Sequence, residues 1–136
     1  LLPPGKRVGV ITANTEILGP EHLEAAGASG DTPVVGAQEM GNAWPPSHIP
    51  RDDPKWDMAA AEADIMAAGD KLVSQHPDIG AVVLECTNMP PFARSVSEHL
   101  RLPVYDMYSF ICWFHAGLAP RDFGHPGSAP REYRER

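Results

Sequence analysis

The stretch Ala81-Val-Val-Leu-Glu-Cys-Thr-Asn-Met-Pro-Pro91 decides the fold expected for this chain. Its first four residues are apolar and partly β-branched, which is typical of a strand buried in a parallel sheet. The apolar run ends before Cys86, and the proline pair that closes the stretch offers a preset helix start. The sequence therefore predicts a strand that ends in a cysteine ahead of a helix. In open α/β sheets, ligands bind at this edge.

Cys86, Thr87 and Asn88 are the first candidate site residues. A helix N-terminus favours anions, so we expect it to lower the pKa of the Cys86 thiol below that of a free cysteine. The hydroxyl of Thr87 and the amide of Asn88 are suited to holding a substrate carboxylate. The same local pattern favours a structural role equally well, as a buried cysteine followed by a polar turn.

Strand and helix patterns alternate along the whole chain. Strands are expected at 7–12, 32–36, 79–85 and 103–106, and helices at 20–26, 54–75, 91–100 and 108–118, with a long Gly/Pro/Asn-rich loop at 37–53. This alternation predicts right-handed crossovers and an α/β fold, a four-stranded parallel sheet flanked by helices. Residues 1–120 are expected to form this single lobe, and residues 121–136 a polar, Pro/Gly-rich and charged tail.

Composition narrows the function classes. A chain of 136 residues that is 43% hydrophobic suffices for one globular domain. Its net charge of −7 argues against nucleic acid or an anionic membrane as a partner. No apolar run reaches the roughly 18 residues of a membrane span. No basic leader followed by a small-residue cleavage site is seen in these residues, so a signal peptide is not expected in them. Two cysteines in these positions do not suggest a disulfide framework, so a reducing cytoplasm is the expected compartment.

The cysteine motif at a strand end resembles the aspartate/glutamate racemase superfamily, in particular the branch whose second half carries Glu-Cys-Thr-Asn-Met-Pro-Pro. Other segments of this chain also fit that branch, namely 5–12, 33–36, 103–106, Trp113 and 117–121. The resemblance implies two similar α/β lobes with the active site between them, and neither a metal nor pyridoxal phosphate. Each lobe would supply one cysteine, and this chain would be the second, C-terminal lobe.

Carried over to this chain, the resemblance implies that Cys86 is the second-lobe cysteine that removes and returns the α-proton of an amino acid. Four polar residues match positions around the substrate: Thr87, Asn88, Thr12 and Asn14. We therefore expect an amino-acid racemase-type isomerase with a small carboxylate or amino-acid substrate. The first-lobe cysteine has no counterpart here, and the opening at Leu1 resembles a linker cut in the middle. The missing N-terminal lobe is thus an expected partner, and the chain alone is expected to be inactive and to self-associate into a homo-oligomer.

Two other functions stay open. A lyase of the same superfamily, a decarboxylase of substituted malonates, uses a single cysteine and would suit this chain. A non-catalytic half-domain that only binds or dimerises is the third class. A Cys/His hydrolase is less favoured, because none of the six histidines is expected beside a strand end.

The remaining candidate groups are expected to be structural. Cys112 lies in the aromatic segment 108–118, which predicts a buried helix in which this thiol packs in the core. Glu85 should point to the opposite face from Cys86, because side chains alternate along a strand. No metal-ligand spacing or phosphate-binding glycine loop occurs.

The topology also predicts where the site residues meet. The strands at 7–12 and 79–85 should be neighbours about 4.8 Å apart. Thr12 and Asn14 should then border the same cleft as Cys86, with Asp106 as its far wall.

Overall fold

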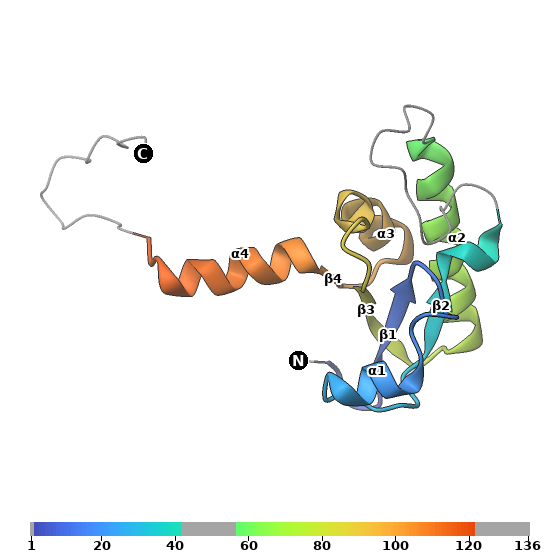
Figure 1. The fold of residues 1–136 in the computed structure, drawn as a ribbon, viewed down its shortest axis with the longest axis horizontal. Coiled ribbons are helices and arrows are strands. Elements are labelled where there is room, and N and C mark those ends of the chain that lie inside the picture. Colours follow the sequence, from blue (N-terminus) through green and yellow to red (C-terminus); the bar gives the residue numbers. More distant parts are fainter. Residues whose placement is uncertain (1, 42–56, 122–136) are drawn as a thin grey trace, which may run out of the picture.

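A computed structural model describes residues 2–41 and 57–121 of the chain (Figure 1). The strands are β1 (Arg7–Thr12), β2 (Val34–Gly36), β3 (Ile79–Leu84) and β4 (Val104–Asp106); the α-helices are α1 (Pro20–Ala25), α2 (Met58–Gln75), α3 (Ala93–Leu100) and α4 (Met107–Leu118). Two short 3₁₀ helices, η1 (Ala37–Met40) and η2 (Pro90–Phe92), follow β2 and precede α3. The rest of the predicted loop and nearly all of the predicted tail lie outside the described residues.

The four strands form one parallel sheet in the order β2-β1-β3-β4. The predicted α/β fold is therefore confirmed. The chain leaves β1 toward β2 on one side, then crosses back over β1 to β3 and continues to β4 on the other side. This reversal makes the β1/β3 pair the topological switch point, where an open α/β sheet forms a ligand crevice at its carboxyl edge.

Helix α2 covers one face of the sheet because its apolar residues repeat every three or four positions. Ala61, Ile65, Ala68 and Leu72 are all buried along this stripe. The helix begins where the Asp57 side chain accepts hydrogen bonds of 3.0 Å from the N–H groups of two residues in the first turn. The sequence placed the start four residues earlier, and the cap expected there, at position 53, lies outside the described residues.

Helices α2 and α3 pack against this same face of the sheet and enclose the hydrophobic core. The core includes sheet residues such as Ile11, Val35, Val82 and Leu84, and helix residues such as Ile65, Leu72, Phe92 and Val96. Strand β1 and helix α2 approach closely at Gly9. A Cβ atom on Gly9 would lie 2.7 Å from Leu72 Cδ2 and 3.0 Å from Ile79 Cδ1. Glycine is thus required here by space.

We predict that Gly9→Ala lowers the free energy of unfolding by about 1–3 kcal/mol, because an extra methyl overpacks a core in which Leu72 is fully buried. Urea denaturation measures this. Gly117→Ala is the matched control, since a Cβ there meets nothing within 4 Å and alanine favours the helix. Equal stability of the Gly9→Ala variant and the wild type would contradict the close β1–α2 contact.

The opposite face of the sheet is only partly covered. Val10 and Ala81 are buried there but lie outside the core cluster, alternating with Ile11 and Val82. In the short helix α1, Leu23 is the one buried residue. Parallel sheets are normally covered on both faces, so this second layer is incomplete within the described residues.

Helix α4 contradicts the sequence prediction. It forms where expected, but it extends away from the sheet after β4 (Figure 1), and none of its residues is buried. Cys112 is exposed rather than packed in a core, and Trp113 is 72% exposed. An apolar helix was expected to be buried in its own domain. Helix α4 instead follows β4 directly and extends outward. No helix among the described residues is long and apolar enough to cross a membrane.

Candidate active site at the β1/β3 edge

The carboxyl ends of β1 and β3 are tied together beside Cys86. Ile11 pairs with Leu84, and the Glu85 N–H donates a 3.0 Å hydrogen bond to the Ile11 carbonyl. The Thr12 hydroxyl donates to Glu85 Oε2 at 2.8 Å. The structure therefore brings Thr12 and Cys86 to the same sheet edge, at the switch point.

Thr12 reaches Glu85 instead of a cleft. Its side chain is 2% exposed, and its hydroxyl proton is used in the bond to the Glu85 carboxylate. Thr12 therefore orients Glu85, and contact of its hydroxyl with a ligand would require this bond to break. This pair was not predicted from the sequence, although the parallel register of β1 and β3 sets Thr12 against Glu85.

Cys86 lies in a turn, half-buried against the edge of the hydrophobic core. The Met89 N–H donates to the Cys86 carbonyl at 3.0 Å, and this turn leads into η2. Helix α3 begins only at Ala93. A turn and a 3₁₀ segment separate the sulfur from that helix. The helix N-terminus is therefore not adjacent to the thiol, and the expected effect of its dipole is absent.

The pKa of Cys86 is raised, so the predicted lowering is wrong. Burial is the largest cause, because it disfavours the charged thiolate. The backbone N–H of Asn88 favours the thiolate and lowers the pKa, while the Glu85 carboxylate raises it further. Cys86 is therefore a neutral thiol at pH 7, and once deprotonated it is a stronger base than an ordinary thiolate.

Glu85 has two effects at this edge. Its bond to Thr12 and the packing of Cys86 against the core agree with the predicted alternation of the two side chains. Its charge nevertheless reaches the sulfur and disfavours the thiolate. An exposed carboxylate near the thiol also attracts a cation in a ligand.

The other predicted site residues are spread around this edge. Thr87 and Asn88 are exposed beside the sulfur. The Asn14 side-chain oxygen accepts a 2.8 Å hydrogen bond from the Glu16 N–H, so it stabilises the loop after β1. Asp106 pairs with Leu84 in the register of β3 and β4, but its carboxylate caps α4 through the Ser109 N–H at 2.8 Å. Thr87 and Asn88 are thus the side chains most open to a ligand.

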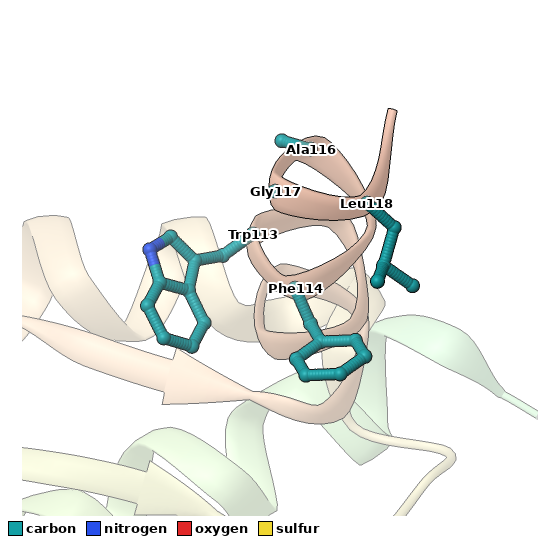
Figure 2. A pocket seen from close by; sticks show the side chains of 5 residues that line it. All are labelled: Trp113, Phe114, Ala116, Gly117 and Leu118. Atoms are coloured by element: carbon teal, nitrogen blue, oxygen red, sulfur yellow. The ribbon is translucent and has the colours of Figure 1, made fainter. Parts of the chain in front are cut away.

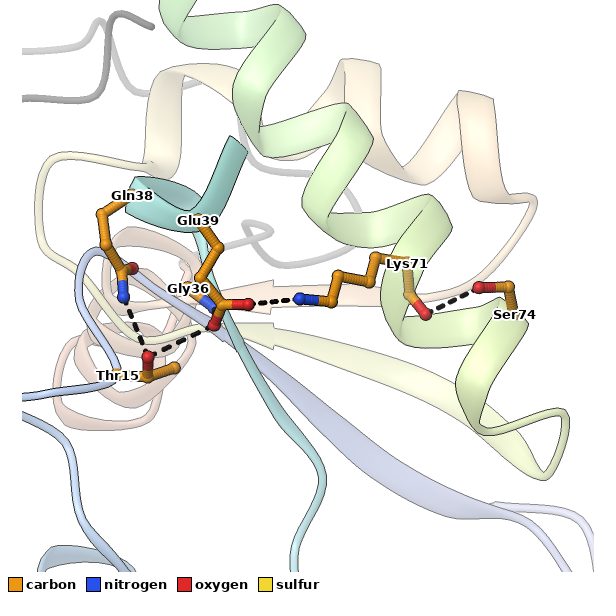
Figure 3. Close-up of polar contacts among 6 residues, drawn as sticks. All are labelled: Thr15, Gly36, Gln38, Glu39, Lys71 and Ser74. Carbon is orange, nitrogen blue, oxygen red and sulfur yellow. Dashed lines mark hydrogen bonds and ion pairs between the residues drawn. The ribbon is translucent and has the colours of Figure 1, made fainter. Parts of the chain in front are cut away.

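A polar network fixes the loops beside this edge (Figure 3). Glu39 of η1 forms an ion pair with Lys71 of α2 and accepts hydrogen bonds from the Gly36 N–H at 3.1 Å and the Thr15 hydroxyl at 3.2 Å. The Gln38 side-chain amide also forms a hydrogen bond of 2.8 Å with the Thr15 hydroxyl. These contacts hold the loop after β1, the end of β2 and helix α2 in one arrangement.

This network makes stability depend on acid pH. Burial alone would raise the pKa of Glu39, but the hydrogen bonds and charge of Lys71, with Gly36 and Thr15, outweigh it and lower the pKa. A lowered carboxyl pKa adds stability at neutral pH that is lost as pH falls through the range where Glu39 protonates.

We predict that Lys71→Met costs about 0.5 kcal/mol of unfolding free energy at neutral pH, where the pair is charged, and less as pH falls through the range where Glu39 protonates. Urea denaturation at a series of pH values measures both numbers. Arg94→Met is the control, because the Arg94–Glu98 pair is far more exposed and should contribute nothing measurable. A Lys71→Met loss that is independent of pH would contradict the assigned role of Glu39.

Two other features bear on the chemistry. No group of three or more His, Cys, Asp or Glu side chains able to hold a metal occurs within residues 2–41 and 57–121. An apolar depression of about 460 Å³ lies on α4, lined by Trp113, Phe114, Ala116, Gly117 and Leu118 (Figure 2). It lies in the C-terminal half of the protruding helix, away from the sheet (Figure 1).

We predict that Glu85→Gln speeds alkylation of Cys86 by iodoacetamide a few-fold at pH 7–8, because removing the nearby charge lowers the thiol pKa. The pH midpoint of the reaction should move down. The measurement uses a Cys112→Ser background, so that alkylation occurs at Cys86 alone. Glu98→Gln, which removes a remote exposed carboxylate, is the control. An unchanged midpoint would show that Glu85 does not act on the sulfur.

Comparisons with known proteins give two similar sequences. A dimethylsulfoniopropionate lyase from Durusdinium sp. clade D is 30% identical over 118 residues, covering 82% of this chain and 38% of that protein. Dimethylsulfoniopropionate lyase 5 from Emiliania huxleyi (strain CCMP1516) is 33% identical over 60 residues, 44% of this chain and 12% of that protein. The chain thus spans less than two fifths of the curated relatives it matches. No protein-family profile and no solved structure matches.

These relatives overturn the predicted activity. Both are named as lyases, so the prediction of an amino-acid racemase-type isomerase is wrong, and the lyase alternative fits better. The error has a chemical cause. A cysteine followed by hydroxyl and amide groups suits proton removal beside a carboxylate, and that step begins an elimination as well as a racemisation.

Proposed function

We propose that this chain carries the thiol-bearing part of a lyase that eliminates dimethyl sulfide from dimethylsulfoniopropionate or a related β-sulfonio carboxylate. The single observation that carries the proposal is the position of Cys86, a high-pKa thiol at the β1/β3 switch point with the Glu85 carboxylate acting on it. The names of the similar sequences supply the substrate class.

The proposed reaction needs one base. The Cys86 thiolate removes a proton from the carbon next to the substrate carboxylate. The electron pair of that C–H bond forms the carbon–carbon double bond, and the bond from the β-carbon to sulfur breaks. Dimethyl sulfide leaves with the pair from that bond, acrylate remains, and the proton stays on the Cys86 sulfur until solvent removes it. Charge and atoms balance without a further reactant.

The raised pKa of Cys86 fits this step. A stronger base removes a weakly acidic carbon-bound proton more readily. The substrate itself brings a sulfonium cation, which favours the thiolate electrostatically and offsets the effect of Glu85. The resting enzyme would then hold a neutral thiol that deprotonates as the cation binds.

The charges at the sheet edge suit a substrate that is a zwitterion. The exposed Glu85 carboxylate attracts the sulfonium group, and it is held in place by Thr12. The exposed Thr87 hydroxyl and Asn88 amide offer donors for the substrate carboxylate. Asn14 would act through the loop after β1, since its side-chain oxygen is engaged there.

The rest of the protein enters only as part of the proposal. A racemase needs an acid or base on each side of the α-carbon, whereas this elimination needs one, which a single lobe can offer. The resemblance to the aspartate/glutamate racemase superfamily remains a prediction about ancestry, supported by the Glu85–Pro91 motif at a strand end. A first lobe that closes the site, and a reducing cytoplasm that keeps Cys86 free, belong to the same proposal.

Incubation of the chain with dimethylsulfoniopropionate, followed by headspace gas chromatography for dimethyl sulfide, tests the function. We expect Cys86→Ser to lower the release rate at least about 100-fold. The serine hydroxyl is a far weaker acid than a thiol, so it stays protonated and cannot serve as the base. Cys112→Ser is the matched control and should keep the wild-type rate. Release that survives in Cys86→Ser, or release that is lost in Cys112→Ser, would contradict the assignment.

Racemisation supplies a further check on the same samples. Optical rotation of L-aspartate or L-glutamate should stay constant with wild-type protein. If the chain releases no dimethyl sulfide, nitrogen-15 NMR titration decides whether it binds the substrate, with shifts expected at the amides of Cys86, Thr87 and Asn88. If the chain neither releases dimethyl sulfide nor shows shifts at these amides, the proposal is wrong.

A further inference from the structure

Glu85 places a fixed negative charge beside the Cys86 sulfur. Its side chain is exposed, and the buried Thr12 hydroxyl donates a 2.8 Å hydrogen bond to its carboxylate. Among the residues that the structure describes, Glu85 is the charged side chain that raises the pKa of the Cys86 thiol. The charge of a molecule bound at this edge therefore determines whether Glu85 attracts it or repels it.

The substrate and the products of the proposed elimination differ in charge beside this carboxylate. Dimethylsulfoniopropionate is a zwitterion, and its sulfonium cation is attached to the β-carbon. When the carbon–sulfur bond breaks, dimethyl sulfide leaves as a neutral molecule and acrylate remains as an anion. Opposite charges attract and like charges repel with an energy that falls with distance. Glu85 thus attracts the substrate before the reaction and repels acrylate after it.

Acrylate is also a reagent for the thiol that forms it. Its double bond is conjugated with the carboxyl group, and thiolates add to the β-carbon of such a system. In that addition the Cys86 Sγ atom bonds to the β-carbon, the electron pair of the double bond moves to the α-carbon, and a solvent proton completes an S-carboxyethyl cysteine. The alkylated sulfur can no longer remove a proton. Because only the thiolate is nucleophilic, the charge state of Cys86 beside acrylate decides whether the addition occurs.

We infer, on the basis of the proposed function, that Glu85 discriminates between the zwitterionic substrate and the anionic product and so protects Cys86 from addition to acrylate. Two effects combine. The carboxylate repels acrylate from the sulfur, and it disfavours the thiolate as soon as the sulfonium charge has left. While the cation is bound, the two charges offset each other and the thiolate can form. Glu85 is therefore a specificity-determining residue.

The rates at which acrylate and acrylamide alkylate each thiol test this inference. The two reagents are nearly equal in size and shape, but acrylamide is uncharged. The ratio of their rates at one thiol therefore cancels its accessibility and its thiolate fraction. Peptide mass spectrometry measures this ratio at Cys86 and at Cys112, which lies on a helix without Asp, Glu, Lys or Arg. At low ionic strength, the acrylate/acrylamide ratio should be about three- to five-fold lower at Cys86 than at Cys112.

Two variants and added salt assign this difference to Glu85. Glu85→Gln should raise the ratio at Cys86 to about that at Cys112. Glu98→Gln removes an exposed carboxylate on α3 and should leave the ratio unchanged. Salt at about 0.5 M should remove most of the wild-type difference, because it screens exposed charges. Equal wild-type ratios at the two thiols, a ratio at Cys86 that Glu85→Gln leaves unchanged, or a Cys86 that neither reagent alkylates would overturn the inference.

Turnover separates this inference from the proposed function. During incubation with dimethylsulfoniopropionate, the Glu85→Gln protein should accumulate more Cys86 adduct per molecule of dimethyl sulfide released than the wild type. The adduct adds the mass of one acrylic acid. If the alkylation ratios behave as expected but no dimethyl sulfide is released, the proposed function fails and the charge discrimination stands. If dimethyl sulfide is released and the Glu85→Gln protein gathers no more adduct than the wild type, this inference is wrong and the proposed function stands.

Discussion

The pairing of β1 with β3 is the constraint on which the rest of the structure depends. These strands are far apart in sequence, and the long helix α2 must cross the sheet to bring β3 back beside β1. Gly9 permits that crossing, because a side chain there would meet Leu72 of α2. The same pairing ends with Ile11 opposite Leu84, so the polar residues that follow both strands emerge together at the switch point. The β1–β3 pairing thus determines the positions of both the core and the candidate site.

The fold could be predicted from the sequence because its signals are local. The β-branched run before Glu85 and the stripe along α2 each mark an element by its own periodicity, and the alternation of elements implies the parallel sheet. The surroundings of two groups could not be predicted in this way. Cys112 lies in an apolar segment that predicts burial, but its exposure follows from the direct junction at Asp106. The Cys86 pKa depends on burial and on Glu85, which only the three-dimensional packing determines.

The proposed lyase would use the same residues as the predicted isomerase, in a different role. A thiolate that removes a proton beside a carboxylate can be followed by return of a proton or by loss of a leaving group. The substrate decides which, through the presence of a good leaving group at the β-carbon. A raised thiol pKa and a neighbouring carboxylate disfavour a resting thiolate, and the proposed cationic substrate would supply the compensating charge. Thr12 contributes indirectly by holding that carboxylate.

The most direct measurement of the central claim is substrate protection of the two thiols in one sample. Alkylation of Cys86 and Cys112 would be followed by peptide mass spectrometry while dimethylsulfoniopropionate is increased. If the ligand binds at the β1/β3 edge, it covers the Cys86 sulfur, so labelling of Cys86 should fall to a plateau while labelling of Cys112 stays constant. Labelling of Cys86 that is unaffected by the substrate, or a parallel fall at both thiols, would contradict a site at Cys86.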